Sequence, residues 1–114
     1  MIISAITLFV LSAMLGVVLL TYVLKNKETP KGLAFIHGPL AVIGLIILII
    51  YAFNNLGGKS HFQSIILFIL AASGGFVMIA RDLLGKTIPK WLAIVHGLLA
   101  ATGLALLIIH TFWD

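Results

Sequence analysis

The sequence contains no cysteine and very little charge. Seven Lys or Arg and three Asp or Glu make up 9% of the 114 residues. Without cysteine the chain cannot form disulfides, thiolate metal sites or cysteine-ligated iron–sulfur clusters. A soluble domain of ordinary composition is about a quarter charged. So little charge predicts that lipid, rather than water, surrounds most of this chain.

Acidic residues are the scarcest charged type, and all three lie outside the long apolar stretches. Glu28 and Asp82 fall in loops that are otherwise basic, and Asp114 is the last residue. The sequence shows no acidic pair, no nucleophile–base arrangement and no G-x-x-x-x-G-K-[ST] phosphate-binding motif. A proton-coupled transporter usually carries an intramembrane carboxylate. The pattern therefore disfavours transport and a stand-alone enzyme.

Apolar sequence is what the chain has in abundance: 62% of its residues are hydrophobic and the mean hydropathy is +1.28. Four uncharged stretches are each long enough for the roughly 20 residues that cross a bilayer as a helix. We predict transmembrane helices at 2–24, 32–53, 62–83 and 89–112. Helices are the expected form because lipid offers no hydrogen-bond partners to the backbone.

Basic residues concentrate in the loops at 25–31 and 81–90, which hold Lys25, Lys27, Lys31, Arg81, Lys86 and Lys90. The positive-inside rule places both loops in the cytoplasm and both termini outside, in a bacterial-type inner or plasma membrane. The net charge of +4 therefore indicates topology and contact with lipid headgroups. Nucleic-acid binding is not expected.

The chain is an internal duplication. A shift of 59 residues aligns 2–53 with 61–112, and 23 of the 52 aligned pairs are identical. The informative matches are Gly16/Gly75, Lys27/Lys86, Pro30/Pro89, Lys31/Lys90, His37/His96, Gly38/Gly97 and Gly44/Gly103. We predict an all-α bundle of four transmembrane helices built from two tandem hairpins, 1–56 and 57–114. A pseudo-two-fold axis along the membrane normal should relate these hairpins.

Two histidines occupy equivalent places in the repeat. His37 and His96 each follow a helix-opening lysine by six residues, or about 9 Å along a helix axis. The symmetry therefore predicts two imidazoles at one depth. If their helices turn these faces to the axis, the imidazoles point toward each other. Small residues line the surrounding helix faces, among them Gly16, Gly44, Gly75 and Gly103.

This arrangement favours haem b over a bare metal ion. Neutral imidazole is the commonest metal ligand, but zinc and copper normally take three or four ligands, and no other ligand type lies at this depth. An iron porphyrin needs only two axial ligands, and its flat ring suits a face of small residues. Lys31 and Lys90, together with the helix N-termini, are candidates to hold its propionates.

Plainer interpretations of the same residues stay open. Small residues also let membrane helices approach closely. Lysines at helix ends extend toward the interface. A membrane histidine can form an interhelical hydrogen bond instead of binding a metal.

His61 and His110 form a possible second haem site near the opposite end. Their repeat counterparts are Ile2 and Tyr51, so the duplication does not pair them. A second haem there would complete an electron path across the membrane. Ordinary interfacial polar residues are the alternative.

On His37, His96, their small-residue faces and the four-span plan, the chain resembles a small b-type membrane cytochrome. In architecture it is similar to the cytochrome b561-like four-helix group. The resemblance implies haem held by histidines from two helices, and electron transfer to or from quinone or a partner redox protein. Two alternatives are a non-catalytic accessory subunit of a larger respiratory or photosynthetic membrane complex, and a small haem or metal carrier. A homo-oligomer is compatible with each.

Overall fold

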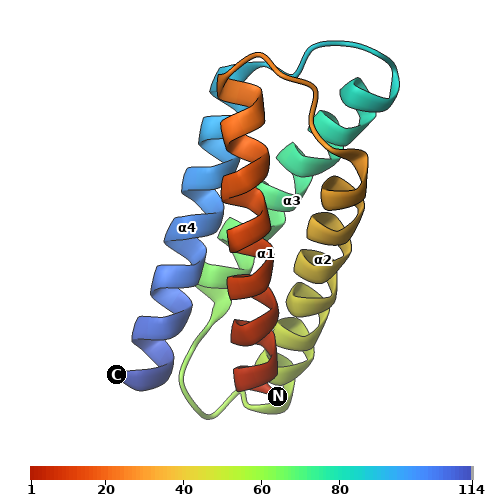
Figure 1. Ribbon diagram of the computed structural model, residues 1–114. Helices are drawn as coiled ribbons and strands as arrows, with labels where there is room; N and C mark the ends of the chain where they lie inside the picture. The colour runs from red at the N-terminus through yellow and green to blue at the C-terminus, as the bar shows by residue number, and fades with distance from the viewer. Residues whose placement is uncertain (114) are drawn as a thin grey trace.

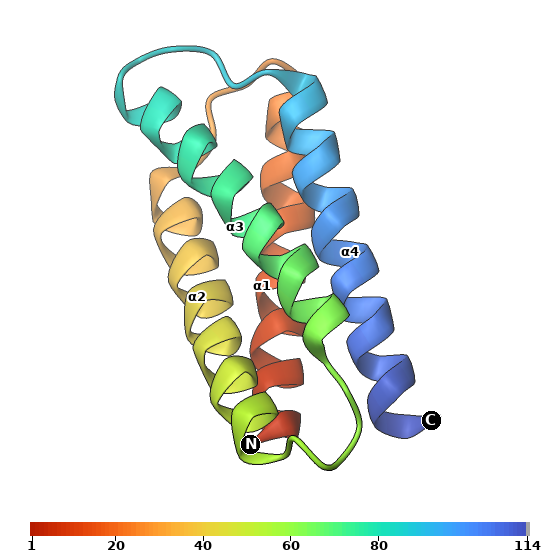
Figure 2. The same ribbon diagram turned by 180° about the vertical axis from the view of Figure 1, so that it is seen from behind.

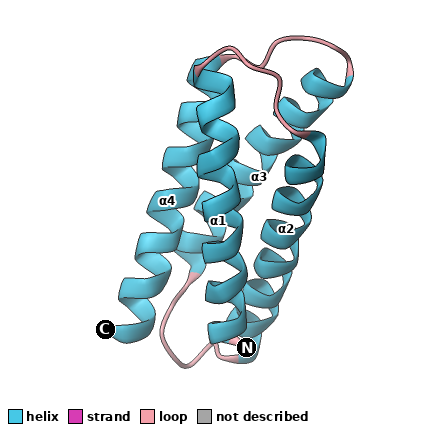
Figure 3. Cartoon of the chain, in the orientation of Figure 1, coloured by secondary structure: helices cyan, strands magenta, loops and turns pink. Residues whose placement is uncertain are grey.

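The computed structural model describes residues 1–113 as four long helices joined by three loops (Figures 1 and 3). The helices are α1 (Ile2–Leu24), α2 (Lys31–Asn54), α3 (Phe62–Leu83) and α4 (Lys90–Phe112). The predicted spans agree with these bounds to within one residue. Helix α4 begins one residue later than predicted because Pro89 has an extended ψ of 131° and is the N-cap rather than the first helical residue.

Each helix is long and apolar enough to cross a membrane. The helices contain 22 to 24 residues, which corresponds to about 33–36 Å at 1.5 Å per residue. That length exceeds the roughly 30 Å of a bilayer's hydrocarbon core. Large apolar side chains such as Met14, Val17 and Phe76 are exposed on the outside of the bundle. The protein is therefore suited to a lipid bilayer.

Helices α2 and α4 form a diagonal pair. The pairs that pack against each other are α1–α2, α3–α4, α1–α4 and α2–α3. Figures 1 and 2 show α1 and α3 on opposite faces of the bundle, with α2 and α4 at its sides. Both basic loops lie at one end, whereas the start of α1, the end of α4 and the α2–α3 loop lie at the other (Figure 1).

The tightest packing lies in the half near the chain ends. The rings of Phe9 and Phe68 stack there with centroids 4.0 Å apart and an interplanar angle of 9°. A Cβ atom at Gly44 would meet the Phe9 ring at 3.4 Å, and one at Gly103 would meet the Phe68 ring at 3.2 Å. These two glycines therefore accommodate the stacked rings. The rest of this core consists of Ala5, Leu48, Ala52, Ile65 and Leu107.

The half of the bundle near the basic loops has few fully buried residues. Residues 13–43 and 72–102 contain a single buried residue, Ala93. His37 and His96 lie in these segments and are half-buried. The histidines are therefore outside the aromatic core, in the half where few side chains are fully buried.

Candidate functional site

The imidazoles of His37 on α2 and His96 on α4 meet across the diagonal of the bundle. Their ring centroids are 6.1 Å apart and the ring planes are inclined at 78°. Because α2 and α4 do not pack against each other, these side chains bring together two helices that are otherwise separate. The structure thus unites the two histidines that the repeat pairs.

Each imidazole is anchored through Nδ1 to a backbone carbonyl of the other helix in its hairpin. Nδ1 of His37 lies 2.7 Å from the Ser12 carbonyl oxygen, and Nδ1 of His96 lies 2.6 Å from that of Ala71. A carbonyl oxygen only accepts hydrogen bonds, so both Nδ1 atoms must carry the proton. In the neutral imidazole Nε2 then keeps an unprotonated lone pair.

This arrangement is the one that metal-binding histidines usually have. Such a histidine typically donates its other ring N–H to a carbonyl or carboxylate, which fixes the tautomer and the ring orientation. His37 and His96 both satisfy this condition without any further rearrangement. The contacts of Ser12 and Ala71 use backbone carbonyls, which every residue has, so no sequence signal could have identified them.

Gly16 and Gly75 lie against the histidine rings. A Cβ atom at Gly16 would come within 2.9 Å of His37 Cε1, and one at Gly75 within 3.3 Å of His96 Cε1. The sequence analysis assigned these glycines to space for a cofactor. In the structure they provide the space in which the imidazoles themselves sit.

The two lysines predicted to hold propionates differ in their surroundings. The ammonium of Lys31 forms an ion pair with Asp82 Oδ2 at 2.6 Å, and the hydroxyl of Thr29 donates to the same oxygen at 3.0 Å. Lys90 is exposed and forms no ion pair with another residue of the described chain. The sequence indicates a loop position for Asp82, whereas the structure places it in the last turn of α3. Its pairing with Lys31 has no signal in the repeat, because its counterpart there is Val23.

The histidine pair has no third partner of the usual metal-binding types. Within residues 1–113, no group of three or more His, Asp or Glu is placed to hold a metal ion. Two imidazoles fall short of the three or four ligands typical of zinc. They equal the number of axial positions that a porphyrin leaves on its iron.

His61 and His110 lie in one region near the chain ends. His61 is the N-cap of α3 and is only 2% exposed. Burial lowers the pKa of His61, and the nearby His110 and Lys59 lower that pKa further. The ring of Tyr51 packs beside His61 with centroids 5.8 Å apart.

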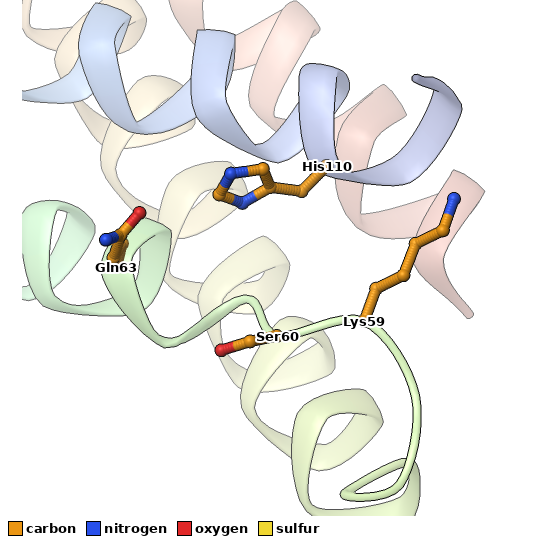
Figure 4. A pocket seen from close by; sticks show the side chains of 4 residues that line it. All are labelled: Lys59, Ser60, Gln63 and His110. Atoms are coloured by element: carbon orange, nitrogen blue, oxygen red, sulfur yellow. The ribbon is translucent and has the colours of Figure 1, made fainter. Parts of the chain in front are cut away.

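An open pocket of about 420 Å³ adjoins this region, and Lys59, Ser60, Gln63 and His110 line it. Figure 4 shows the Gln63 and His110 side chains extending toward a common space, while Lys59 extends away from it. The ammonium of Lys59 donates to the Thr111 carbonyl at 3.0 Å. His61 is not among the lining residues, so this pocket does not present both histidines to one ligand.

No protein-family model, curated protein or solved structure matches this chain. The internal repeat and the geometry of its histidine pair therefore carry the functional assignment.

Proposed function

We propose that this protein binds one haem b between α2 and α4, with His37 and His96 as its axial ligands, and carries electrons within the membrane. The histidine pair carries this proposal. Its rings are 6.1 Å apart, each Nδ1 is bound to a backbone carbonyl, and each Nε2 is left as an electron-pair donor.

The spacing of the rings suits one shared metal. Two metal–imidazole bonds of about 2 Å each, plus half an imidazole at either side, span about 6 Å. When bound, the haem would supply the one-electron redox chemistry. The protein would orient the two ligands and surround them with a medium of low polarity, and both factors tune a haem potential.

The haem would lie in the loop-side half of the bundle, which holds both histidines. This half contains a single buried residue, Ala93, and α2 and α4 begin there. Their positive N-terminal ends and the ammonium of Lys90 favour the carboxylates of the propionates. Lys31 could assist only by releasing Asp82, to which it is now bound.

We further propose that a pseudo-two-fold axis along the membrane normal relates the hairpins 1–56 and 57–114. Equivalent residues meet in two places: Phe9 stacks on Phe68, and His37 faces His96. Each hairpin also anchors its histidine to a residue 25 positions earlier. A single haem on this axis would receive one ligand from each hairpin.

The charge pattern indicates how the protein would be oriented in the membrane. Both basic loops would face the cytoplasm of a bacterial-type cell and both termini would face outside. Quinone or a partner redox protein would exchange electrons with the haem. A further haem at His61 and His110 is less well supported, because the pocket near them is lined by His110 without His61.

The test is spectroscopic. The protein is expressed with an ample supply of haem, purified in mild detergent, and measured as reduced-minus-oxidised spectra with quantified haem. We expect a six-coordinate b-type spectrum at one haem per chain. His37→Ala and His96→Ala should each lose the six-coordinate spectrum and leave a haem with one histidine ligand, while His110→Ala should leave the spectrum unchanged. A stable but colourless protein, or full spectra in both histidine variants, would overturn the proposal.

In the alternative function, the protein is a non-catalytic subunit of a larger membrane complex. The two histidines then have only a structural role, in hydrogen bonding and helix packing. The close approach of Gly16 and Gly75 to the imidazoles favours it, because such packing needs no cofactor. Under this alternative the protein is colourless, both alanine variants lose thermal stability, and partner subunits co-purify at a fixed ratio.

A further inference from the structure

We infer that the two histidines are unequal ligands: Ser12 holds His37 in place, and His96 is the ligand that yields to a small neutral molecule such as carbon monoxide. This inference rests on the proposed haem site. It concerns which of the two histidines could leave the iron, a question that the repeat leaves undecided because it pairs them as equivalents.

Ser12 holds both the ring and the backbone of His37. The Nδ1–H of His37 lies between two acceptors, the Ser12 carbonyl at 2.7 Å and the Ser12 Oγ at 3.0 Å. The Ser12 hydroxyl proton is then used on the His37 carbonyl, at 3.0 Å. Ser12 is itself only 3% exposed, so water does not compete well for these bonds.

His96 has only the backbone part of this arrangement. Its Nδ1–H donates to the Ala71 carbonyl at 2.6 Å, and Ala71 occupies the repeat position of Ser12. Alanine has no hydroxyl to accept from the ring or to donate to the His96 carbonyl. His37 therefore has two hydrogen bonds that His96 lacks.

The ring of His96 also has more space around it than the ring of His37. A Cβ atom at Gly16 would lie 2.9 Å from His37 Cε1, whereas one at Gly75 would lie 3.3 Å from His96 Cε1. Gly74 also adjoins His96, with a hypothetical Cβ 3.7 Å from His96 Cβ. The repeat counterpart of Gly74 is Leu15, so only His96 has two neighbouring glycines and the extra room that they leave.

Ligand exchange would therefore take place on the α4 side. If the haem is bound as proposed, Nε2 of His96 would give up its bond to the iron and the lone pair of a small neutral molecule would replace it, so one ligand bond would be exchanged for another. One net hydrogen bond shifts such an equilibrium by about 2- to 10-fold. His37, which has the additional bonds, would remain as the other ligand.

The first arm of the test needs no haem. Nitrogen NMR of the haem-free protein, with ¹⁵N-labelled histidine in detergent micelles, reports the protonation of each ring nitrogen. Ser12→Ala should shift the His37 Nδ1 signal and leave that of His96 in place, and Ala71→Ser should shift His96 alone. Ser73→Ala is the matched control, because this exposed hydroxyl donates to the Ile69 carbonyl on its own helix. An unchanged His37 signal in Ser12→Ala would overturn the inference.

The second arm uses the reduced, haem-loaded protein and carbon monoxide, read by the infrared C–O stretch. The wild type should give a single band that coincides with the band of His96→Ala. Ser12→Ala should add a second band that matches His37→Ala, and Ala71→Ser should weaken carbon monoxide binding about 2- to 10-fold. A wild-type band that matches His37→Ala, or no complex at saturating carbon monoxide, would overturn the inference.

The two arms separate this inference from the function on which it rests. Failure of the wild type to take up haem overturns the proposed function, and the NMR arm alone then decides whether Ser12 makes the histidines unequal. If the alanine variants of the histidines do not fold, Ala71→Ser still tests the exchange, because it keeps both ligands. In that case an unaltered carbon monoxide affinity in Ala71→Ser overturns it.

Discussion

The imidazoles of His37 and His96 lie 6.1 Å apart although their helices do not pack against each other. Each ring reaches the other because it is anchored within its own hairpin, to the carbonyl of a residue 25 positions earlier. The same hydrogen bond from histidine Nδ1 to a backbone carbonyl is thus present in both hairpins. The pairing across the bundle depends on how the two hairpins are docked.

Replacing the glycines that lie against the imidazoles should destabilise the protein to different degrees. Gly16→Ala places a methyl group 2.9 Å from His37 Cε1, whereas Gly75→Ala places one 3.3 Å from His96 Cε1. Overpacking of this kind costs about 1–3 kcal/mol, so we expect Gly16→Ala to destabilise the protein more than Gly75→Ala. Thermal unfolding in detergent measures the difference.

Gly97→Ala is the control for these variants. Nothing lies within 4 Å of its hypothetical Cβ, and replacing a helical glycine with alanine stabilises a helix by about 0.5–1 kcal/mol. We therefore expect this variant to be at least as stable as the wild type. Equal stability in all three variants would show that the imidazoles are not held against α1 and α3 as described.

The contact between Lys31 and Asp82 predicts a small coupling between α2 and α3. The pair is partly solvent-exposed, with 44% of the Lys31 side chain accessible, so a double-mutant cycle with Lys31→Met and Asp82→Asn should give about 0.2–1 kcal/mol. Added salt should reduce this coupling. Glu28→Gln is the control, and a coupling that is absent at low salt would contradict the contact.

The lowered pKa of His61 predicts that the protein becomes less stable in mild acid. Burial, His110 and Lys59 lower its pKa below the usual value of 6.5, so the folded protein binds a proton at this site less readily than the unfolded chain. The contribution of neutral His61 to the stability of the folded protein is therefore complete above pH 6.5. It is lost progressively as the pH falls from 6.5 toward the lowered pKa of the folded state.

Thermal unfolding between pH 8 and pH 5 measures this effect. We expect His61→Gln to flatten the acid side of the profile. Lys59→Met should narrow the pH range over which stability is lost. Removal of this nearby positive charge lets the pKa of His61 in the folded protein rise back toward its usual value. If wild type and His61→Gln have the same pH profile, His61 is not the group responsible.

The absence of cysteine makes the topology directly measurable. Single cysteines replace Glu28 and Thr87, one in each basic loop, and Ser60 in the loop between α2 and α3. Because both basic loops lie at one end of the bundle (Figure 1), the first two should react with an impermeant thiol reagent from one side of the membrane and Ser60→Cys from the other. The positive-inside rule expects the basic loops to react only from the cytoplasmic side. Labelling of Glu28→Cys and Thr87→Cys from opposite sides would contradict the fold.

The sequence by itself determined the helices and the pairing of the histidines. Span length and hydropathy are local properties, which is why the predicted boundaries agree with the structure to within one residue. The repeat also identified His37 and His96 as equivalent. The same alignment pairs Phe9 with Phe68, but only the structure shows that their rings stack.

Only the tertiary structure decided what these residues touch. The helices are apolar on all sides, so no polar face in the sequence indicates how each helix is rotated about its axis. That rotation places the Ser12 carbonyl against His37, turns Gly44 toward the Phe9 ring and leaves His61 buried. The Lys31–Asp82 ion pair likewise depends on the docking of two hairpins, because it joins residues 51 positions apart that have no relation in the repeat.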